Sequence, residues 1–297
     1  MAQPSPLTPA LLTDADLDWL RQSRGELGRR LQYKLVVQSD QWLDTSYEFL
    51  RRHFGREVLD PPERFRDWLD MNRRGVHPFP FILQTAYVVR ERRAWVLGVI
   101  AGNLMRVEPS RPDAAKSALR AYVFAIGNQL TEPLARAAGV KGVGTRLWRR
   151  AVAEARSITA GLGGRLEYSF LEAENDSVGF WDRMGYRWPR GVTYWQPPLE
   201  FDEQGQYVHP EVPEIAMFKP LDVSARRTIG REVIQDVFAS VWENWVLHEY
   251  RATLSPQAME RAERYVMGTL LDRVESLMPR TPQIGLARIR KGELVPS

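Results

Sequence analysis

The chain has 297 residues, of which 44% are hydrophobic and 26% are charged, as in an ordinary globular protein. It has no cysteine, which excludes disulfides, thiolate metal sites and cysteine nucleophiles. The 41 basic and 37 acidic residues are spread along the chain and leave a net charge of +4, so no dense basic stripe favours nucleic acid as a partner.

The amino terminus and the apolar runs of the chain carry no membrane signal. The amino terminus has no basic segment followed by an apolar core, so it does not resemble a secretory signal. The longest apolar run, residues 94–101, is far shorter than the roughly 20 residues that span a bilayer. We therefore expect a cytoplasmic protein with no membrane partner.

The first predicted elements are a helix, a strand and a second helix. Residues 13–18 are acidic and open the first helix, which closes over residues 25–30, and the apolar residues 31–37 predict a strand. Ser39 and Asp40 are typical of a helix cap, because their side chains accept hydrogen bonds from the free amides of the first turn. The apolar positions of the helix that follows are Trp42, Tyr47, Leu50 and Phe54.

A third helix and a β-hairpin come next. Proline is tolerated in the first turn of a helix, so Pro61 and Pro62, followed by Glu63, predict a helix that continues to about Arg74. Residues 81–90 and 94–105 are rich in β-branched and aromatic residues and are separated by a charged turn, residues 91–93. This is the pattern of a hairpin.

The middle of the chain alternates between strands and helices. Residues 121–126 predict a strand, and residues 145–158 predict a helix with one apolar face. Residues 165–171 predict a further strand, residues 176–184 a short helix, and residues 186–195 a stretch rich in strand.

The last part of the chain is predicted to be helical. Several prolines indicate an irregular connector over residues 197–220 that ends in a short strand, residues 214–218. Residues 224–254 and 255–277 are helical in pattern, with apolar positions at Val233, Val237, Val241 and Trp245 and at Ala258, Ala262, Val266 and Leu270. These helices can form a prop, a lid or the contact of a homodimer, and a prop is the simplest interpretation.

A glycine-rich segment before the predicted helix at residues 145–158 is the first functional signal. Free amides at a helix start point outward and can hold a phosphate or pyrophosphate, and glycine lets the backbone approach such a ligand. The spacing matches neither the P-loop nor the three-glycine dinucleotide fingerprint, which disfavours a nucleoside triphosphate or NAD site. The residues of this signal are Gly139, Val140, Lys141, Gly142, Val143, Gly144, Thr145 and Arg146.

A second motif lies about forty residues further on, at residues 174–186, and includes Asn175, Gly179, Trp181 and Gly185. Together the two segments resemble the acyl-coenzyme A loop and the Asn, aromatic, Gly, aromatic ending of the GNAT acyltransferases. The resemblance extends over residues 31–220 in the order of elements, although its specific residues lie only between residues 123 and 186.

The resemblance implies an α/β (α+β) fold with a mixed, mainly antiparallel twisted sheet flanked by helices. The implied domains are an amino-terminal helical extension (1–30), the acyl-coenzyme A-binding domain (31–220) and a carboxy-terminal helical extension (221–297). The strands at residues 121–126 and 165–171 would splay apart to admit pantetheine.

The resemblance also implies the groups that bind acetyl-coenzyme A or another acyl-coenzyme A. The amides of residues 140–145 would hold the pyrophosphate, with charge added by Lys141 and Arg146, while Asn175 and Trp181 would lie beside the thioester. The backbone groups implied to bind pantetheine belong to Val123, Phe124, Ala125 and Ile126.

Three departures from the family pattern bear on the chemistry. Gly139 replaces the usual Arg or Gln, the link at residues 127–138 is longer than usual, and Trp181 stands where many relatives have a tyrosine that protonates the departing thiolate. That role then moves to Tyr168, Tyr186 or Tyr194, or is omitted, since a thiol with a pKa of about 8.5 is a fair leaving group.

The base that deprotonates the acceptor is expected to be a carboxylate near the implied site. Glu132 and Glu172 are the first candidates, followed by Glu167. The four histidines are scattered and lack the spacing of a metal site, so no metal is predicted.

The leading hypothesis is therefore an N-acyltransferase, in the first place an N-acetyltransferase, whose acceptor is a small-molecule or peptide amine. A catalytically silent module that binds coenzyme A is the alternative, suggested by Trp181 in place of tyrosine. A basic protein associated with nucleic acid is the third hypothesis, and salt-dependent retention on DNA or RNA would distinguish it.

Overall fold

The computed structural model describes residues 7–54, 59–107, 120–173, 176–198, 200–221, 227–251 and 253–289. The chain divides into two compact units. The first consists of Met1–Leu104 and Ile126–Ile158, and the second of Met105–Ala125 and Thr159–Ser297.

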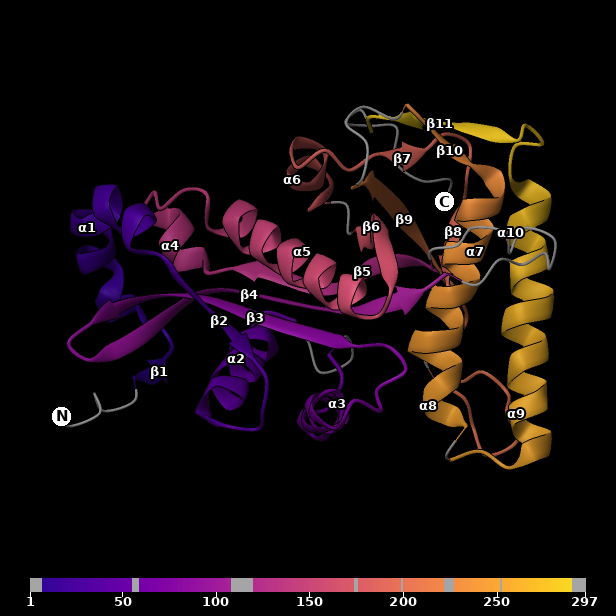
Figure 1. Ribbon diagram of the computed structural model, residues 1–297, viewed down its shortest axis with the longest axis horizontal. Helices are drawn as coiled ribbons and strands as arrows, with labels where there is room; N and C mark the ends of the chain where they lie inside the picture. Colours follow the sequence, from indigo (N-terminus) through magenta and orange to yellow (C-terminus); the bar gives the residue numbers. More distant parts are fainter. Residues whose placement is uncertain are drawn as a thin grey trace. The chain divides into compact units, whose positions relative to one another are not determined.

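The strands form a larger and a smaller sheet (Figure 1). The larger has eight strands, and its registered pairs are antiparallel except for β1 on β4, which confirms the predicted mixed, mainly antiparallel α/β class. In order it contains β2 (Gln32–Val36), β3 (Phe81–Arg90), β4 (Arg93–Arg106), β5 (Arg120–Thr131), β6 (Gly164–Ala173), β9 (Val212–Pro220) and β8 (Tyr194–Gln196), with β1 (Thr8–Ala10) beside β4. The smaller sheet contains β10 (Thr228–Gly230), β11 (Gln283–Ala287) and β7 (Trp188–Pro189).

The helices of the first unit begin and end where local signals place them. Helix α1 (Leu17–Arg30) precedes α2 (Gln41–Arg51), and the Asp40 carboxylate caps α2 by accepting hydrogen bonds from the amides of Trp42 and Leu43 at 2.9 and 3.3 Å. Pro62 opens α3 (Pro62–Arg74), which ends at Gly75 with a left-handed φ of 68°. Helices α2 and α3 share an apolar core with β3 and β4.

The hairpin of β3 and β4 is confirmed, with a tighter turn than expected. Arg90 pairs with Arg93, so the loop is only Glu91 and Arg92, both with positive φ. Two-residue turns of this kind match the twist of the strands they join, and they favour Asn-Gly because both positions are left-handed.

The prediction that a strand ends at residue 126, followed by a long link, is wrong. β5 continues to Thr131 and is followed by α4 (Pro133–Ala137) and α5 (Val143–Gly161). The polar residues after Gly127 do not alternate with apolar ones as in a typical strand. Backbone hydrogen bonds to the neighbouring strand hold this segment extended, and the amide of Glu132 donates to the carbonyl of Leu97 at 2.9 Å.

In the second unit, α6 (Val178–Arg183) confirms the short helix, whereas the stretch at residues 186–195 contains only β7 and the start of β8. The described part of the helix predicted over residues 224–254 begins at Arg231, because β10 comes before it. It consists of α7 (Arg231–Trp242), a π-helical turn (Glu243–Leu247) and α8 (His248–Tyr250). The next helix is confirmed as α9 (Pro256–Glu263), a π-helical stretch (Arg264–Leu270) and α10 (Leu271–Leu277).

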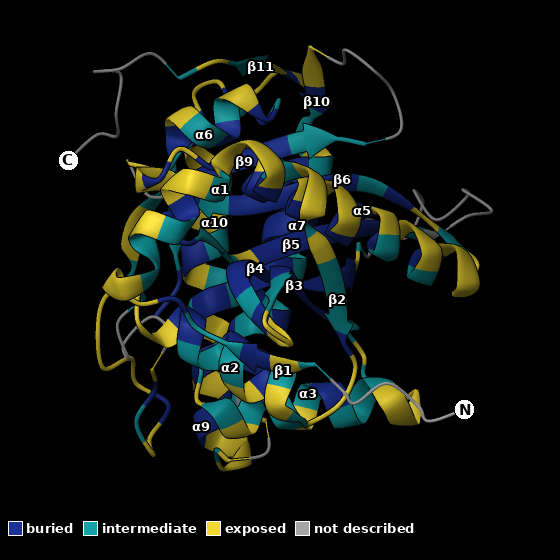
Figure 2. Cartoon of the chain, turned by 90° about the vertical axis from the view of Figure 1, so that its left-hand side faces the viewer, coloured by how far each residue is buried: buried dark blue, intermediate teal, exposed yellow. Residues whose placement is uncertain are grey.

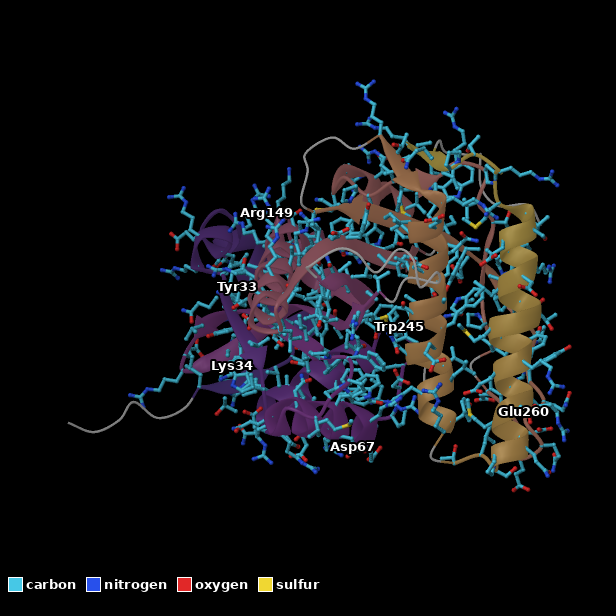
Figure 3. All side chains as sticks on the ribbon, turned by 45° about the vertical axis from the view of Figure 1, so that its right-hand side comes forward. Tyr33, Lys34, Asp67, Arg149, Trp245 and Glu260 are labelled. Atoms are coloured by element: carbon cyan, nitrogen blue, oxygen red, sulfur yellow. The ribbon has the colours of Figure 1, made fainter. Side chains whose placement is uncertain are left out.

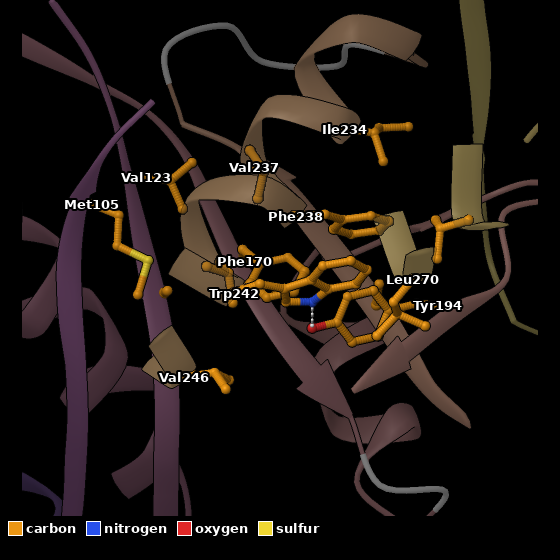
Figure 4. Packing of buried hydrophobic residues seen from close by; sticks show 14 of the residues in the cluster. Met105, Val123, Phe170, Tyr194, Ile234, Val237, Phe238, Trp242, Val246 and Leu270 are labelled. Carbon is orange, nitrogen blue, oxygen red and sulfur yellow. Dashed lines mark hydrogen bonds between the residues drawn. The ribbon is translucent and has the colours of Figure 1, made fainter. Parts of the chain in front are cut away.

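The core of the second unit joins these helices to β6, β8 and β9 (Figure 4). Buried residues of α7 recur at helical intervals and form one apolar stripe. They are Ile234, Val237, Phe238, Val241 and Trp242. This packing favours the prop among the three interpretations of the carboxy-terminal helices.

The outer surfaces are charged. Strands in the middle of the larger sheet are coloured as buried in Figure 2, whereas charged side chains such as Glu260 of α9, labelled in Figure 3, are exposed. Within the described ranges, no helix is both long and apolar enough to cross a membrane.

Replacing Glu91 by Asn together with Arg92 by Gly should stabilise the protein. Their φ angles of 52° and 63° strain L side chains by roughly 1–2 kcal/mol per residue, and Asn-Gly relieves this strain. We expect the free energy of unfolding to rise by about 1 kcal/mol, measured by urea denaturation. Arg92→Ala keeps a Cβ at positive φ and should give no gain. An unchanged midpoint in the double variant would contradict the strain argument.

Candidate active site

The candidate active site is a hydrogen-bonded carboxylate in the second unit. Alternation along β6 puts Tyr168, Phe170 and Glu172 on one face of the strand. Tyr168 and Phe170 are buried in the core, whereas Glu172, one residue before the end of β6, is half-buried. The strand thus carries a carboxylate at the margin of an apolar layer.

Two side chains of β8 donate to this carboxylate. The hydroxyl of Tyr194 donates to Oε1 of Glu172, and Nε2 of Gln196 donates to Oε2 at 2.9 Å. The register explains the convergence, because Glu172 pairs with Ala216 of β9 and Tyr194 pairs with Glu214 two residues earlier. Tyr194 and Gln196 are two residues apart and therefore lie on the same face.

The Tyr194 hydroxyl has a second partner in α7. Nε1 of Trp242 donates to it at 2.9 Å, and both side chains are almost fully buried. The Tyr194 ring packs against Phe238, with ring centroids 4.6 Å apart, and edge-on against Phe170 at 6.0 Å. Aromatic contacts of this kind hold the ring in one orientation.

Burial raises the pKa of Glu172 from its ordinary value of 4.5 to about 7. The hydrogen bond from Tyr194 lowers it, the charge of Glu214 raises it, and the hydrogen bond from Gln196 lowers it, so burial decides the outcome. Burial and the charge of Glu172 together raise the pKa of Tyr194 well above its ordinary value. At neutral pH the pair can therefore accept a proton at Glu172, while Tyr194 remains a neutral donor.

Tyr186, which was also a candidate for the general acid, has a structural partner instead. Tyr186 is buried with its hydroxyl 2.5 Å from Oγ of Ser169, which itself donates to the carbonyl of Phe124 at 3.1 Å. Ser169 has one proton, so Tyr186 is the donor of that bond. Trp181 is buried and packs edge-on against Tyr186, with ring centroids 5.1 Å apart. Both aromatic residues thus serve the packing of α6.

Among the residues predicted to bind pantetheine, Val123, Phe124 and Ala125 belong to the second unit, and Ile126 belongs to the first. All four side chains are buried in β5, which leaves only backbone groups for a ligand. Asn175 lies outside the described residues.

The predicted phosphate loop is in the first unit and begins α5. Gly142 has a φ of 79°, and its carbonyl accepts the first helical hydrogen bond, from the amide of Arg146 at 3.1 Å. By helix geometry, the amides of the next residues, Val143 to Thr145, have no partner within the helix. Val140 is buried, and Lys141 is exposed beside this helix start.

Arg146 is turned toward α1. Its guanidinium donates to the carbonyl of Gly28, in the last turns of that helix. The guanidinium thus ties α1 to α5, and Lys141 is a second exposed cation of the predicted loop.

Glu132 and Glu167 have local structural partners. Glu132 is buried and caps α4, because its carboxylate accepts a hydrogen bond from the amide of Leu134 at 3.1 Å. Glu167 forms an ion pair with Arg165 on β6 at 2.6 Å. Of the three predicted bases, only Glu172 is brought together with a predicted tyrosine.

Sequence reasoning missed Gln196 and Trp242. A signal for Gln196 was present, since residues two apart in a strand share a face and Tyr194 was already a candidate. Trp242 lies in an apolar helical stripe and is separated from Tyr194 by 48 residues, so no local pattern relates the two. Within the described ranges, no group of three or more His, Asp and Glu side chains is arranged to hold a metal.

Comparisons with known proteins give matches among solved structures. No family model matches the chain, and no curated protein does. Arabidopsis thaliana NAA60 in complex with a bisubstrate analogue matches 65% of this chain and 99% of its own, with 12% identity and a TM-score of 0.44. A protein from Bacteroides thetaiotaomicron, named as an acetyltransferase of the GNAT family, matches 72% of this chain and 97% of its own, with 14% identity and a TM-score of 0.42.

A third match is the Bacillus subtilis acetyltransferase in complex with CoA, over 64% of this chain and 99% of its own, with 14% identity and a TM-score of 0.33. The three carry the names of acetyltransferases or, for NAA60, of a complex with a bisubstrate analogue, and one is named for the family that the two sequence motifs predict. With TM-scores below 0.5, the chain's own residues remain the basis for its function.

Glu172 should make the protein less stable as the pH rises. Its pKa of about 7 when folded exceeds the ordinary 4.5, so between these values the folded state binds a proton that the unfolded state has lost. Raising the pH from 4.5 to 8 should therefore lower the free energy of unfolding of the wild type, relative to Glu172→Gln, by up to about 3 kcal/mol. Urea denaturation at several pH values measures this difference.

The exposed Glu203 provides the control, because Glu203→Gln removes one carboxylate without touching the core. This variant should follow the wild type at every pH. Parallel pH dependences of the wild type and Glu172→Gln would show that the Glu172 carboxyl titrates normally.

Proposed function

We propose that the protein is an acyl-coenzyme A-dependent N-acyltransferase in which Glu172 accepts the proton of the acceptor amine. The observation that carries the proposal is the Glu172 carboxylate with its two donors, Tyr194 and Gln196, at the margin of the core. A base is most effective when its pKa lies near the working pH, and burial raises that of Glu172 to about 7.

The proposed reaction is a direct transfer. The amine nitrogen attacks the thioester carbonyl, the new C–N bond forms, and the C–S bond breaks with its electron pair going to sulfur. The amine gives one proton to Glu172. Since Tyr194 directs its hydroxyl at Glu172 and its pKa is raised well above the ordinary value, it is a poor acid for the thiolate. Coenzyme A then leaves as the thiolate, whose conjugate thiol has a pKa of about 8.5.

The helix start of α5 is the proposed site for the phosphates of the cofactor. Its support is the left-handed φ of Gly142, which turns the chain into the helix, together with the amides of residues 143–145, which have no partner within the helix, and the exposed Lys141. Arg146 is assigned to α1 rather than to the ligand, because it donates to the carbonyl of Gly28.

Lys141→Glu should weaken binding of acetyl-coenzyme A. Reversing an exposed charge beside an anionic ligand lowers affinity by roughly ten-fold at low salt. Calorimetric titration measures the change. The matched control is Arg156→Glu, an equal change of charge on the exposed side of the same helix, about 20 Å further along it. Equal losses in both variants would assign the effect to net charge, and no binding to the wild type would contradict the cofactor proposal.

Glu172→Gln should lower kcat for acetyl transfer by roughly 10²–10⁴-fold, because the amide cannot accept the amine proton. Release of free thiol with a panel of amines measures turnover, and calorimetry should show unchanged binding of acetyl-coenzyme A. Wild-type kcat should rise as the pH passes through about 7, where Glu172 loses its proton.

Glu132→Gln is the control for the rival base. The amide oxygen still accepts from the Leu134 amide and preserves the cap, so turnover should remain at the wild-type level. A larger loss of kcat in this variant than in Glu172→Gln would assign the base to Glu132 and a structural role to Glu172. Binding of the thioester with no turnover of any amine by the wild type would favour the silent coenzyme A-binding module.

A further inference from the structure

Helix α7 contributes a polar atom to the environment of Glu172. Nε1 of Trp242 donates to the hydroxyl oxygen of Tyr194 at 2.9 Å, and this hydroxyl in turn donates to Oε1 of Glu172. Figure 4 shows the indole and the phenol with this hydrogen bond between them. The three groups come from α7, β8 and β6, so the chain of hydrogen bonds crosses from the sheet to the carboxy-terminal helices within the second unit.

The indole fixes the direction of the chain. A phenol hydroxyl can donate or accept, whereas an indole N–H can only donate. Because Trp242 occupies the oxygen of Tyr194 as an acceptor, the single proton of Tyr194 is directed to Glu172. Without the indole N–H, this constraint on the hydroxyl proton is lost.

The side chains around the pair restrict other arrangements. Trp242 is fully buried, its ring plane lies 12° from that of Phe238, and the centroids of these two rings are 6.2 Å apart. Phe238 also packs on Tyr194. The indole therefore cannot turn its N–H elsewhere without disturbing the rings of Phe238 and Tyr194.

We propose that Trp242 is a positioning residue, which holds the Tyr194 hydroxyl as a donor to Glu172 and so makes helix α7 part of the site. The catalytic role of Trp242 rests on the proposed function, whereas its hydrogen bond to Tyr194 does not depend on that function. It gives the carboxy-terminal helices a role beyond that of a prop.

Among the described residues, the ionisable groups that act on the pKa of Glu172 are Tyr194 of β8 and Glu214 of β9, and α7 contributes the uncharged indole. Removing the indole N–H changes neither charge. The hydrogen bond from Tyr194 lowers the pKa of Glu172, so its weakening should raise that pKa above about 7. The loss of part of one hydrogen bond corresponds to a rise of up to about one pKa unit.

The test compares Trp242→Phe with Trp245→Phe. Trp245 lies three residues further along the same helical segment, is half-buried, and is labelled in Figure 3, so the control removes an indole of the same segment. Carbon-13 NMR of the carboxyl resonance that disappears in Glu172→Gln reports the pKa of Glu172 directly. We expect a rise of about half a unit to one unit in Trp242→Phe and no change in Trp245→Phe.

Turnover gives a second readout. In Trp242→Phe, kcat at pH 7 should fall by roughly two- to five-fold and recover near pH 9, because only the protonation of Glu172 has changed. A loss of the same size at every pH, or an unshifted carboxyl resonance, would overturn the positioning role. If the wild type turns over no amine, the proposed function fails, and the NMR titration still decides the role of Trp242.

A variant with the same shape guards against misfolding. Phenylalanine leaves a gap in the core, and Trp242→Phe is unusable if circular dichroism shows loss of structure. Benzothienylalanine at position 242 replaces the N–H by sulfur and keeps the bicyclic shape. It should give the same rise in the pKa of Glu172, and an unchanged pKa in that protein would overturn the proposal.

Discussion

One constraint governs the second unit. The Glu172 carboxylate and the Tyr194 hydroxyl lie against an apolar core, and the polar atoms of both need hydrogen-bond partners there. Buried polar groups without partners are costly, whereas a complete network fixes the elements that supply it. Both oxygens of Glu172 have donors, and the Tyr194 hydroxyl both donates and accepts. A slip of β8 by one residue would turn Tyr194 and Gln196 to the other face, so the network also specifies the register of that strand.

Local signals predicted much of the fold. Asp40 and Pro62 act through their own backbone neighbourhood, and the helices that they open begin where the sequence predicts. The continuation of β5 past residue 126 could not be predicted in this way, because pairing with neighbouring strands orders polar residues that have little strand preference. The three-residue strands β1 and β10 likewise carry no periodicity of their own.

The sequence also predicted only part of the candidate site, because strand pairing decides which residues meet there. Glu172 and Tyr194 could be singled out by residue type and by resemblance, but their meeting depends on the pairing of β6 and β8 with β9. Trp242 could not be found, because it reaches the site through the packing of an otherwise apolar helix. Glu132 was as strong a candidate for the base as Glu172 in the sequence, but its carboxylate caps helix α4.

The pKa of Glu172 also bears on the second half of the proposed reaction. A carboxyl group with a pKa of about 7 is a stronger acid than a thiol with a pKa of about 8.5, so the proton taken from the amine can pass on to the departing thiolate with a favourable difference of about 2 kcal/mol. A carboxyl at its ordinary value would be a much weaker base toward the amine. Burial of one carboxylate therefore suits both transfers, which removes the need for a separate tyrosine acid and makes Trp181 compatible with turnover.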